Sequence, residues 1–119
     1  MIVAGIGCRR GCAADAIVML VRRAETVAGC RADRLAAPGF KRDEAGLRDA
    51  AVVLGLALVF LPDEAMAAVQ PHCPTRSDAA LRATGLASVA EAAALAASGG
   101  RLLLPRIEGA GVTCALAGA

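Results

Sequence analysis

The chain has 119 residues, of which 57% are hydrophobic and 20% are charged, and it carries a formal net charge of +2. This composition excludes intrinsic disorder, and we expect residues 1–119 to form a single domain around a hydrophobic core. The chain contains no Tyr or Trp, only two Phe residues and a weak positive charge, so a nucleic-acid-binding role is not expected.

The longest apolar stretch, residues 50–61, is shorter than the roughly 20 residues that span a bilayer, so we expect no membrane contact. Charged residues soon after Arg9 and Arg10 exclude a signal peptide. The five cysteines are scattered along the chain, which is typical of reduced thiols. These features predict a cytoplasmic protein.

The first half of the chain alternates short apolar runs with helical periodicity. Gly29 and Gly55 stand where two amphipathic helices would end, because glycine adopts the left-handed conformation that closes a helix. The run at 56–61 is apolar throughout, which is typical of a strand buried on both faces. The predicted elements are a strand at Ile2–Ile6, a helix at Asp15–Ala28, a weak strand at Arg34–Ala37, a helix from Asp43 or Glu44 to Gly55, and a strand at Leu56–Leu61.

The second half is predicted to hold helices and a terminal hairpin. Pro62 suits the first turn of a short helix. Pro105 cannot donate a ladder hydrogen bond, so its strand is expected at a sheet edge or with a bulge. The other predicted elements are a loop at Gln70–Pro74, one or two helical turns at Ser77–Thr84, a helix at Ser88–Ser98, and strands at Arg101–Ile107 and Val112–Ala117. Together the elements predict an α/β fold of three layers, α/β/α, with a mixed, mostly parallel sheet of about five strands and a C-terminal hairpin.

Three glycines and two arginines cover the end of the first predicted strand and the loop after it. Gly5, Gly7 and Gly11 allow the backbone to approach a ligand, and Arg9 and Arg10 supply donors for carboxylates or phosphates. Unpaired amides at the start of the next helix would complete an anion-holding loop. The spacing is one residue longer than the dinucleotide fingerprint and no GK[ST] follows, so a nucleotide-binding module is a secondary interpretation. A tight turn with solvated arginines is the structural alternative.

The segment Lys41–Glu44 follows the second predicted strand. Because the carboxyl ends of neighbouring parallel strands meet at one edge of a sheet, Lys41 is expected to face the same ligand as Arg9 and Arg10. A plain helix start with surface charge is the alternative, since Asp and Glu favour that position.

Ser88 and Glu91 have the spacing of a capping box, in which the hydroxyl bonds a backbone amide and the carboxylate reaches back. The alanines that follow make one side of this helix flat. A flat side suits either packing on the sheet or the approach of a broad ligand, and the sequence leaves both open.

Cys8 and Cys12 lie four residues apart near a helix start, where the pKa of a thiol can fall. With His72 and Cys73 they could in principle hold a metal, but no ligand spacing repeats, so no metal and no cofactor are predicted. A single histidine does not define a catalytic triad.

Three segments together resemble a known family. They read GIGCRRG at 5–11, KRDEAGL at 41–47 and SVAEAAAL at 88–95, and Ser77 ahead of Gly85 also fits. In order and spacing they resemble the CobE/CbiG C-terminal family of cobalamin (vitamin B12) biosynthesis, over essentially the whole chain and in the stand-alone CobE-like form.

The resemblance implies a corrin-ring ligand, a precorrin or hydrogenobyrinic acid-type intermediate, and a role as carrier, chaperone or accessory factor. Such a ligand is broad, apolar and edged with carboxylates, so small side chains would form the floor of its site and cations the rim. The implied ligand-binding positions are Gly5, Gly7, Cys8, Arg9, Arg10, Gly11, Lys41, Asp43, Glu44, Ser88 and Glu91.

The longer CbiG proteins of this family are associated with opening the lactone ring of a cobalt-precorrin and releasing acetaldehyde. The chain lacks their additional N-terminal region, so a lactone hydrolase of the cobalt-precorrin-5A type is the alternative rather than the leading interpretation. Its catalytic base would be Glu44 or Glu91, with loop amides as oxyanion donors. Other enzymes of the pathway and a second copy of the chain are further candidate partners.

Overall fold

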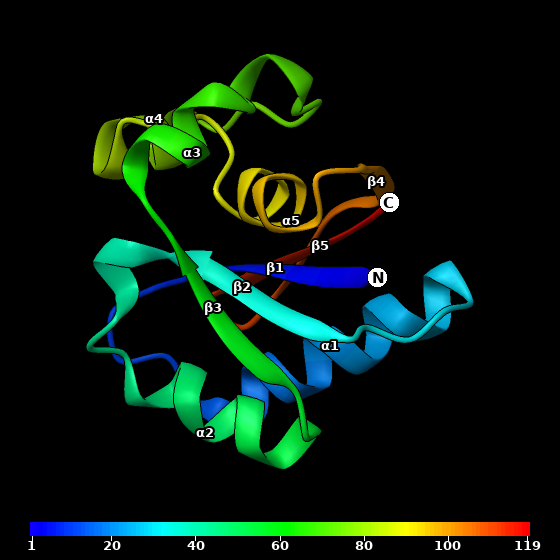
Figure 1. The fold of residues 1–119 in the computed structure, drawn as a ribbon. Helices are drawn as coiled ribbons and strands as arrows, with labels where there is room; N and C mark the ends of the chain where they lie inside the picture. The colour runs from blue at the N-terminus through cyan, green and yellow to red at the C-terminus, as the bar shows by residue number, and fades with distance from the viewer.

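The computed structural model describes residues 1–119, which form five strands interleaved with helices (Figure 1). Two short 3₁₀ turns, Gly39–Lys41 and Gln70–His72, follow the second strand and the third helix. None of the helices is long and apolar enough to cross a membrane. The elements are β1 (Ile2–Cys8), α1 (Ala14–Ala28), β2 (Arg34–Pro38), α2 (Ala45–Leu54), β3 (Ala57–Leu61), α3 (Asp63–Ala68), α4 (Asp78–Thr84), α5 (Ala90–Ser98), β4 (Arg101–Gly109) and β5 (Val112–Gly118).

The strands form one sheet in the order β3-β2-β1-β5-β4. β1, β2 and β3 pair in parallel, whereas β5 pairs antiparallel with both β1 and β4. Four strands therefore run in one direction and β5 alone runs in the other. The predicted mixed, mostly parallel sheet with a C-terminal hairpin is confirmed.

Helices cover both faces of the sheet, as the three-layer prediction requires (Figure 1). On one face, Ile17, Leu20 and Val21 of α1 and Leu47 of α2 belong to a core cluster of 15 buried residues. On the other face, a cluster of 10 buried residues includes Met66 of α3 and residues 92–95 of α5. The alanine side of α5 thus packs on the sheet, which resolves the alternative that the sequence left open.

The predicted helix ends are confirmed at two positions where the backbone requires glycine. α1 ends at Gly29 and α2 at Gly55, with φ angles of 71° and 69°, in the left-handed region that other residues avoid. The Gly29 amide N–H donates to the Glu25 carbonyl oxygen (2.9 Å) and so closes the last turn of α1.

The prediction that the strand at 56–61 is buried on both faces is wrong. β3 is an edge strand that pairs only with β2, its Ala57 is exposed, and its other residues are half-buried. After β3 the chain crosses to the far side of β1, so no strand covers this edge. β4 forms the opposite edge and has register shifts on both sides of Leu104, which confirms the expectation for the strand that carries Pro105.

The capping box predicted at Ser88 and Glu91 is also wrong. α5 begins after Val89, and no side chain caps it. The Ser88 hydroxyl donates to Glu91 Oε1 (2.9 Å) instead of accepting from the helix, and the Ser88 amide donates to the side chain of Gln70 (3.2 Å). Glu91 cannot reach back to a cap because its carboxylate faces inward, fully buried.

Candidate functional site

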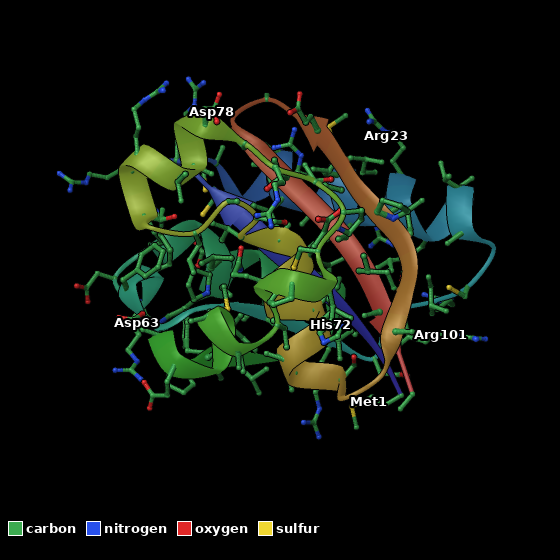
Figure 2. All side chains as sticks on the ribbon, turned by 90° about the horizontal axis from the view of Figure 1, so that it is seen from above. Met1, Arg23, Asp63, His72, Asp78 and Arg101 are labelled. Atoms are coloured by element: carbon green, nitrogen blue, oxygen red, sulfur yellow. The ribbon has the colours of Figure 1, made fainter.

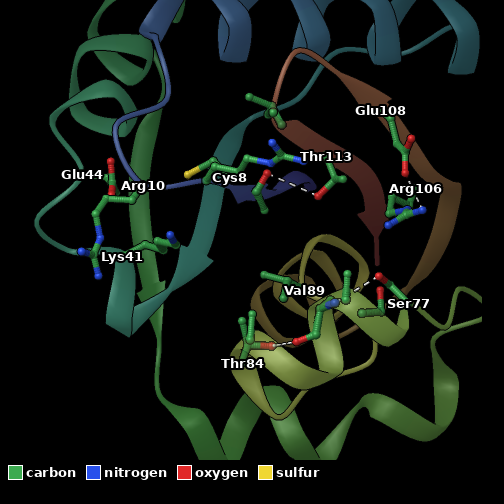
Figure 3. Close-up of a pocket in the computed structure, with 18 of the residues that line it drawn as sticks. Cys8, Arg10, Lys41, Glu44, Ser77, Thr84, Val89, Arg106, Glu108 and Thr113 are labelled. Atoms are coloured by element: carbon green, nitrogen blue, oxygen red, sulfur yellow. Dashed lines mark hydrogen bonds and ion pairs between the residues drawn. The ribbon is translucent and has the colours of Figure 1, made fainter.

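A cleft of about 1120 Å³ opens at the carboxyl ends of β1 and β4 (Figure 3). Its walls come from the loops after β1 and β2, from the β4–β5 hairpin, and from α4 with the connection to α5. The strand order reverses between β1 and β5. The chain adds β2 and β3 on one side of β1, and then β4 and β5 on the other side. Ligands of open α/β sheets bind at such switch points.

Cationic side chains gather on the side of the cleft formed by the β1 and β2 loops. Arg9 and Arg10 are exposed, Lys41 is half-buried, and none of the three has an ion-pair partner. The one ion pair of the structure lies across the cleft, where Arg106 Nη2 is 2.6 Å from Glu108 Oε1 (Figure 3). The loop cations are therefore free to meet an anionic ligand.

The loop after β1 is fixed by hydrogen bonds to two neighbouring segments. The Arg9 amide donates to the Gly111 carbonyl oxygen of the hairpin turn (3.0 Å). The Gly11 amide donates to Glu44 Oε2 (2.9 Å), which joins this loop to the start of α2. Glu44 thus already accepts the Gly11 amide, and no residue of the first turn of α1, whose amides were predicted to complete an anion-holding loop, lines the cleft.

The structure brings eight of the eleven predicted ligand-binding residues together at the cleft. They come from three separate segments of the chain and are Gly7, Cys8, Arg9, Arg10, Lys41, Asp43, Glu44 and Ser88.

The other three, Gly5, Gly11 and Glu91, do not line the cleft. Gly5 lies beneath α5, where a Cβ would overlap the Ala90 carbonyl oxygen, so glycine is required here by helix packing. Gly11 has a φ of 74° and faces Glu44, and Glu91 is buried behind the cleft wall.

Glu91 accepts four hydrogen bonds from three segments of the chain. Thr75 donates from its amide to Oε1 (3.0 Å) and from its hydroxyl to Oε2 (2.8 Å). Ser88 donates to Oε1 (2.9 Å), and the amide of Arg106 donates to Oε2 (3.0 Å). Burial alone would raise the pKa of the Glu91 carboxyl, but these donors hold the pKa below its usual value of 4.5.

The predicted fall in thiol pKa at the start of α1 is wrong for Cys8. Burial and a hydrogen bond with Cys12 raise the pKa of the Cys8 thiol to about 12. The helix begins only at Ala14, so its dipole does not act on this thiol. No group of three or more His, Cys, Asp or Glu residues could hold a metal. His72, the single histidine, lies apart from Asp78 at the start of α4 (Figure 2).

Sequence reasoning missed much of the wall opposite the cationic loops. Ala79, Ala80 and Ala83 of α4 present small apolar side chains, and Arg106 and Thr113 come from β4 and β5. The Thr113 hydroxyl donates to the Gly7 carbonyl oxygen (3.3 Å) and so joins β5 to the loop side of the cleft. Ser77, which fits the family pattern, and the repeated alanines of α4 were the local signals for this wall.

The fold and the cleft define a three-layer α/β protein with a site at the carboxyl ends of its strands. The chain belongs to the cobalamin synthesis G C-terminus family, whose model matches residues 2–117, and it is a protein of cobalamin biosynthesis. The resemblance proposed from the sequence is confirmed.

Two solved structures support this assignment. CobE, a protein from the cobalamin (vitamin B12) biosynthetic pathway, is similar with a TM-score of 0.91 and 40% identity, over 98% of this chain and 89% of that chain. The cobalamin biosynthesis protein chiG from Agrobacterium tumefaciens str. C58 is similar with a TM-score of 0.81 and 47% identity, over 100% of this chain and 98% of that chain. A comparison with curated proteins gave no match.

Proposed function

We propose that the protein binds a corrin-ring intermediate of cobalamin biosynthesis in the cleft and acts as a carrier, chaperone or accessory factor. The observation that carries the proposal is the pairing of a wide cleft with unpaired cations on one side and small apolar side chains on the other. Membership of the family supplies the class of ligand.

The size of the cleft supports a broad ligand. Its volume of about 1120 Å³ lies above the roughly 300–1,000 Å³ of most small-molecule pockets. A corrin ring is flat and apolar, and the alanine side chains of α4 offer it a surface without bulky projections. Gly7 and Val89 also line the cleft and lie next to each other, since a Cβ added at Gly7 would be 3.5 Å from the Val89 side chain.

The charge of the cleft supports a ligand edged with carboxylates. Arg9 and Arg10 extend from a loop whose backbone is fixed at both ends, so their guanidinium groups reach the cleft from a rigid base. Lys41 approaches from the adjacent loop. Guanidinium groups bind carboxylates through two parallel hydrogen bonds, which suits acetate and propionate side chains at the rim of a macrocycle.

The carboxylates of the site favour binding over hydrolysis. Glu91 accepts four donors and does not line the cleft, so it is not placed to activate water. Glu44 lines the cleft, but its carboxylate accepts the Gly11 amide. Four donors lower the pKa of Glu91, and the Glu44 carboxylate is already hydrogen-bonded to the loop, so neither residue has the free geometry that a general base requires.

The test is co-elution with hydrogenobyrinic acid on gel filtration, followed by visible absorbance of the protein peak. We expect a coloured peak from the wild type and roughly tenfold weaker binding for Arg9→Ala and for Arg10→Ala. Arg101→Ala is the matched control, since it removes the same charge from an exposed position outside the cleft. A colourless wild-type peak refutes the proposal, and a change in ligand mass after incubation with a lactone-bearing precorrin would establish the hydrolase instead.

A further inference from the structure

Residues 75–88, here called the flap, form the α4 side of the cleft. Seven of the residues that line the cleft belong to this segment, yet α4 itself has no buried residue. The flap therefore joins the hydrophobic core only near its C-terminal end, where Leu86 and Ala87 are buried. Its position depends on how its two ends are attached to the rest of the protein.

Both ends of the flap are attached to one carboxylate. Thr75 begins the flap and donates twice to Glu91, and Ser88 ends the flap and donates once. The Ser77 amide also donates to the Ala87 carbonyl oxygen (2.8 Å), which brings the two ends together just above Glu91. Glu91 is fully buried in the first turn of α5, on the rigid layer that packs against β1.

The same carboxylate reaches the opposite wall. The Arg106 amide donates to Glu91 Oε2, while the Arg106 guanidinium lines the cleft in its ion pair with Glu108. Each carboxylate oxygen thus has two donors, and all four partners are donors. Only an ionised carboxylate satisfies them, because each oxygen faces one backbone N–H, which cannot accept a hydrogen bond from the NH₂ group of a glutamine.

From this geometry we infer that Glu91 is a positioning residue that closes the base of the flap and fixes the α4 wall relative to Arg106. Ligand binding depends on it through the flap and not through contact, since Glu91 does not line the cleft. The expected effect of Glu91 on ligand binding rests on the proposed function, whereas its expected effect on the position of the flap does not.

Amide hydrogen exchange of Glu91→Gln tests the effect on the flap. We expect the amides of residues 77–87 to exchange at least about tenfold faster than in the wild type, with the amides of β1 unchanged. Glu25→Gln is the matched control, because Glu25 also accepts a backbone amide, that of Ala32 (2.8 Å), but lies on α1. Unchanged exchange in the flap, or an equal increase in β1, would overturn the inference.

Thr75→Val provides a second variant that removes only one of the four donors. It should accelerate exchange of the flap less than Glu91→Gln does, and the double variant should exchange no faster than Glu91→Gln alone. Independent structural damage would add, so additive effects would also overturn the inference. If Glu91→Gln does not fold, the exchange pattern of Thr75→Val alone decides the question.

Binding of hydrogenobyrinic acid tests the effect of Glu91 on the ligand. Glu91→Gln should bind it about tenfold more weakly than Glu25→Gln does, and a loosened flap with undiminished affinity would overturn the positioning role. If the wild type itself does not bind, the proposed function fails, and the exchange measurements still decide whether Glu91 holds the flap.

Discussion

Substitution of Gly5 by alanine separates a packing role from a ligand-binding role for the first glycine of the loop. Gly5 lies in β1 under α5, and a Cβ at this position would lie 2.5 Å from the Ala94 amide nitrogen and closer still to the Ala90 carbonyl oxygen. Both are backbone atoms of a helix. The clash therefore cannot be relieved by rotation of a side chain, and α5 must move away from the sheet.

The loss of stability follows from the packing of α5 on β1 that this movement disturbs. Real Cβ atoms essentially never approach other heavy atoms within 3.0 Å, so α5 must shift by more than half an ångström at Ala90 and Ala94. Overpacking of a dense core typically costs 1–3 kcal/mol. Because the obstacle here is backbone, we expect Gly5→Ala to lower the free energy of unfolding by about 3 kcal/mol, or the Tm by roughly 10 °C.

The assay is urea unfolding followed by far-UV circular dichroism. Gly109→Ala is the control, since its added Cβ would meet only the flexible side chain of Leu20, at 3.3 Å, and we expect it to cost less than about 1 kcal/mol. The reasoning is refuted if Gly5→Ala is as stable as Gly109→Ala. A stable Gly5→Ala variant that no longer binds hydrogenobyrinic acid would instead establish Gly5 as a ligand-binding residue.

Three further predictions concern titration, accessibility and capping. Because donors hold the pKa of Glu91 below 4.5, the unfolded chain binds the proton more tightly, so the urea midpoint should fall as pH drops below about 4.5. Glu91→Gln should weaken this dependence of the urea midpoint on pH, and an unaltered dependence would contradict the lowered pKa of Glu91. The Cys114 thiol is fully buried and its pKa is raised to about 12 by burial, so a thiol reagent should label it only at the rate of unfolding; labelling in native buffer within seconds would contradict this. Ser77 caps α4 by accepting the Ala80 amide (3.1 Å), so Ser77→Ala should destabilise the protein by about 1 kcal/mol in urea titrations, whereas Ser98→Ala should have a smaller effect.

The sequence predicted the order and type of the elements because their signals are local. Periodicity and a terminal glycine lie within one helix, as at Gly29 and Gly55, and no distant contact overrides them. The errors arose where a distant segment decides the outcome. Residues 56–61 are as apolar as a central strand, yet whether β3 lies at the centre or the edge depends on where the chain goes after it.

The site shows the same division between local and distant signals. The cationic loops were predicted because they follow strands that the sequence reveals, and both lie at the cleft. Ser88 and Glu91 have the spacing of a cap, but the amides of Thr75 and Arg106, in other segments of the chain, donate hydrogen bonds to the Glu91 carboxylate. Thr113 meets Gly7 across 106 residues of sequence, a separation that no local pattern reveals.

The pairing of β1 with β5 sets an order on folding. The first strand of the chain occupies the middle of the sheet, and its partner on one side is the last strand, in register from Ile2 opposite Gly118 to Cys8 opposite Val112. During synthesis one side of β1 therefore stays open until Val112–Gly118 has been made. Contacts of such long range slow folding, because the entropy of closing the loop is lost before the contacts form. A chain that ends a few residues early would lack part of a central strand, and its β1 would present an open edge able to pair with other chains.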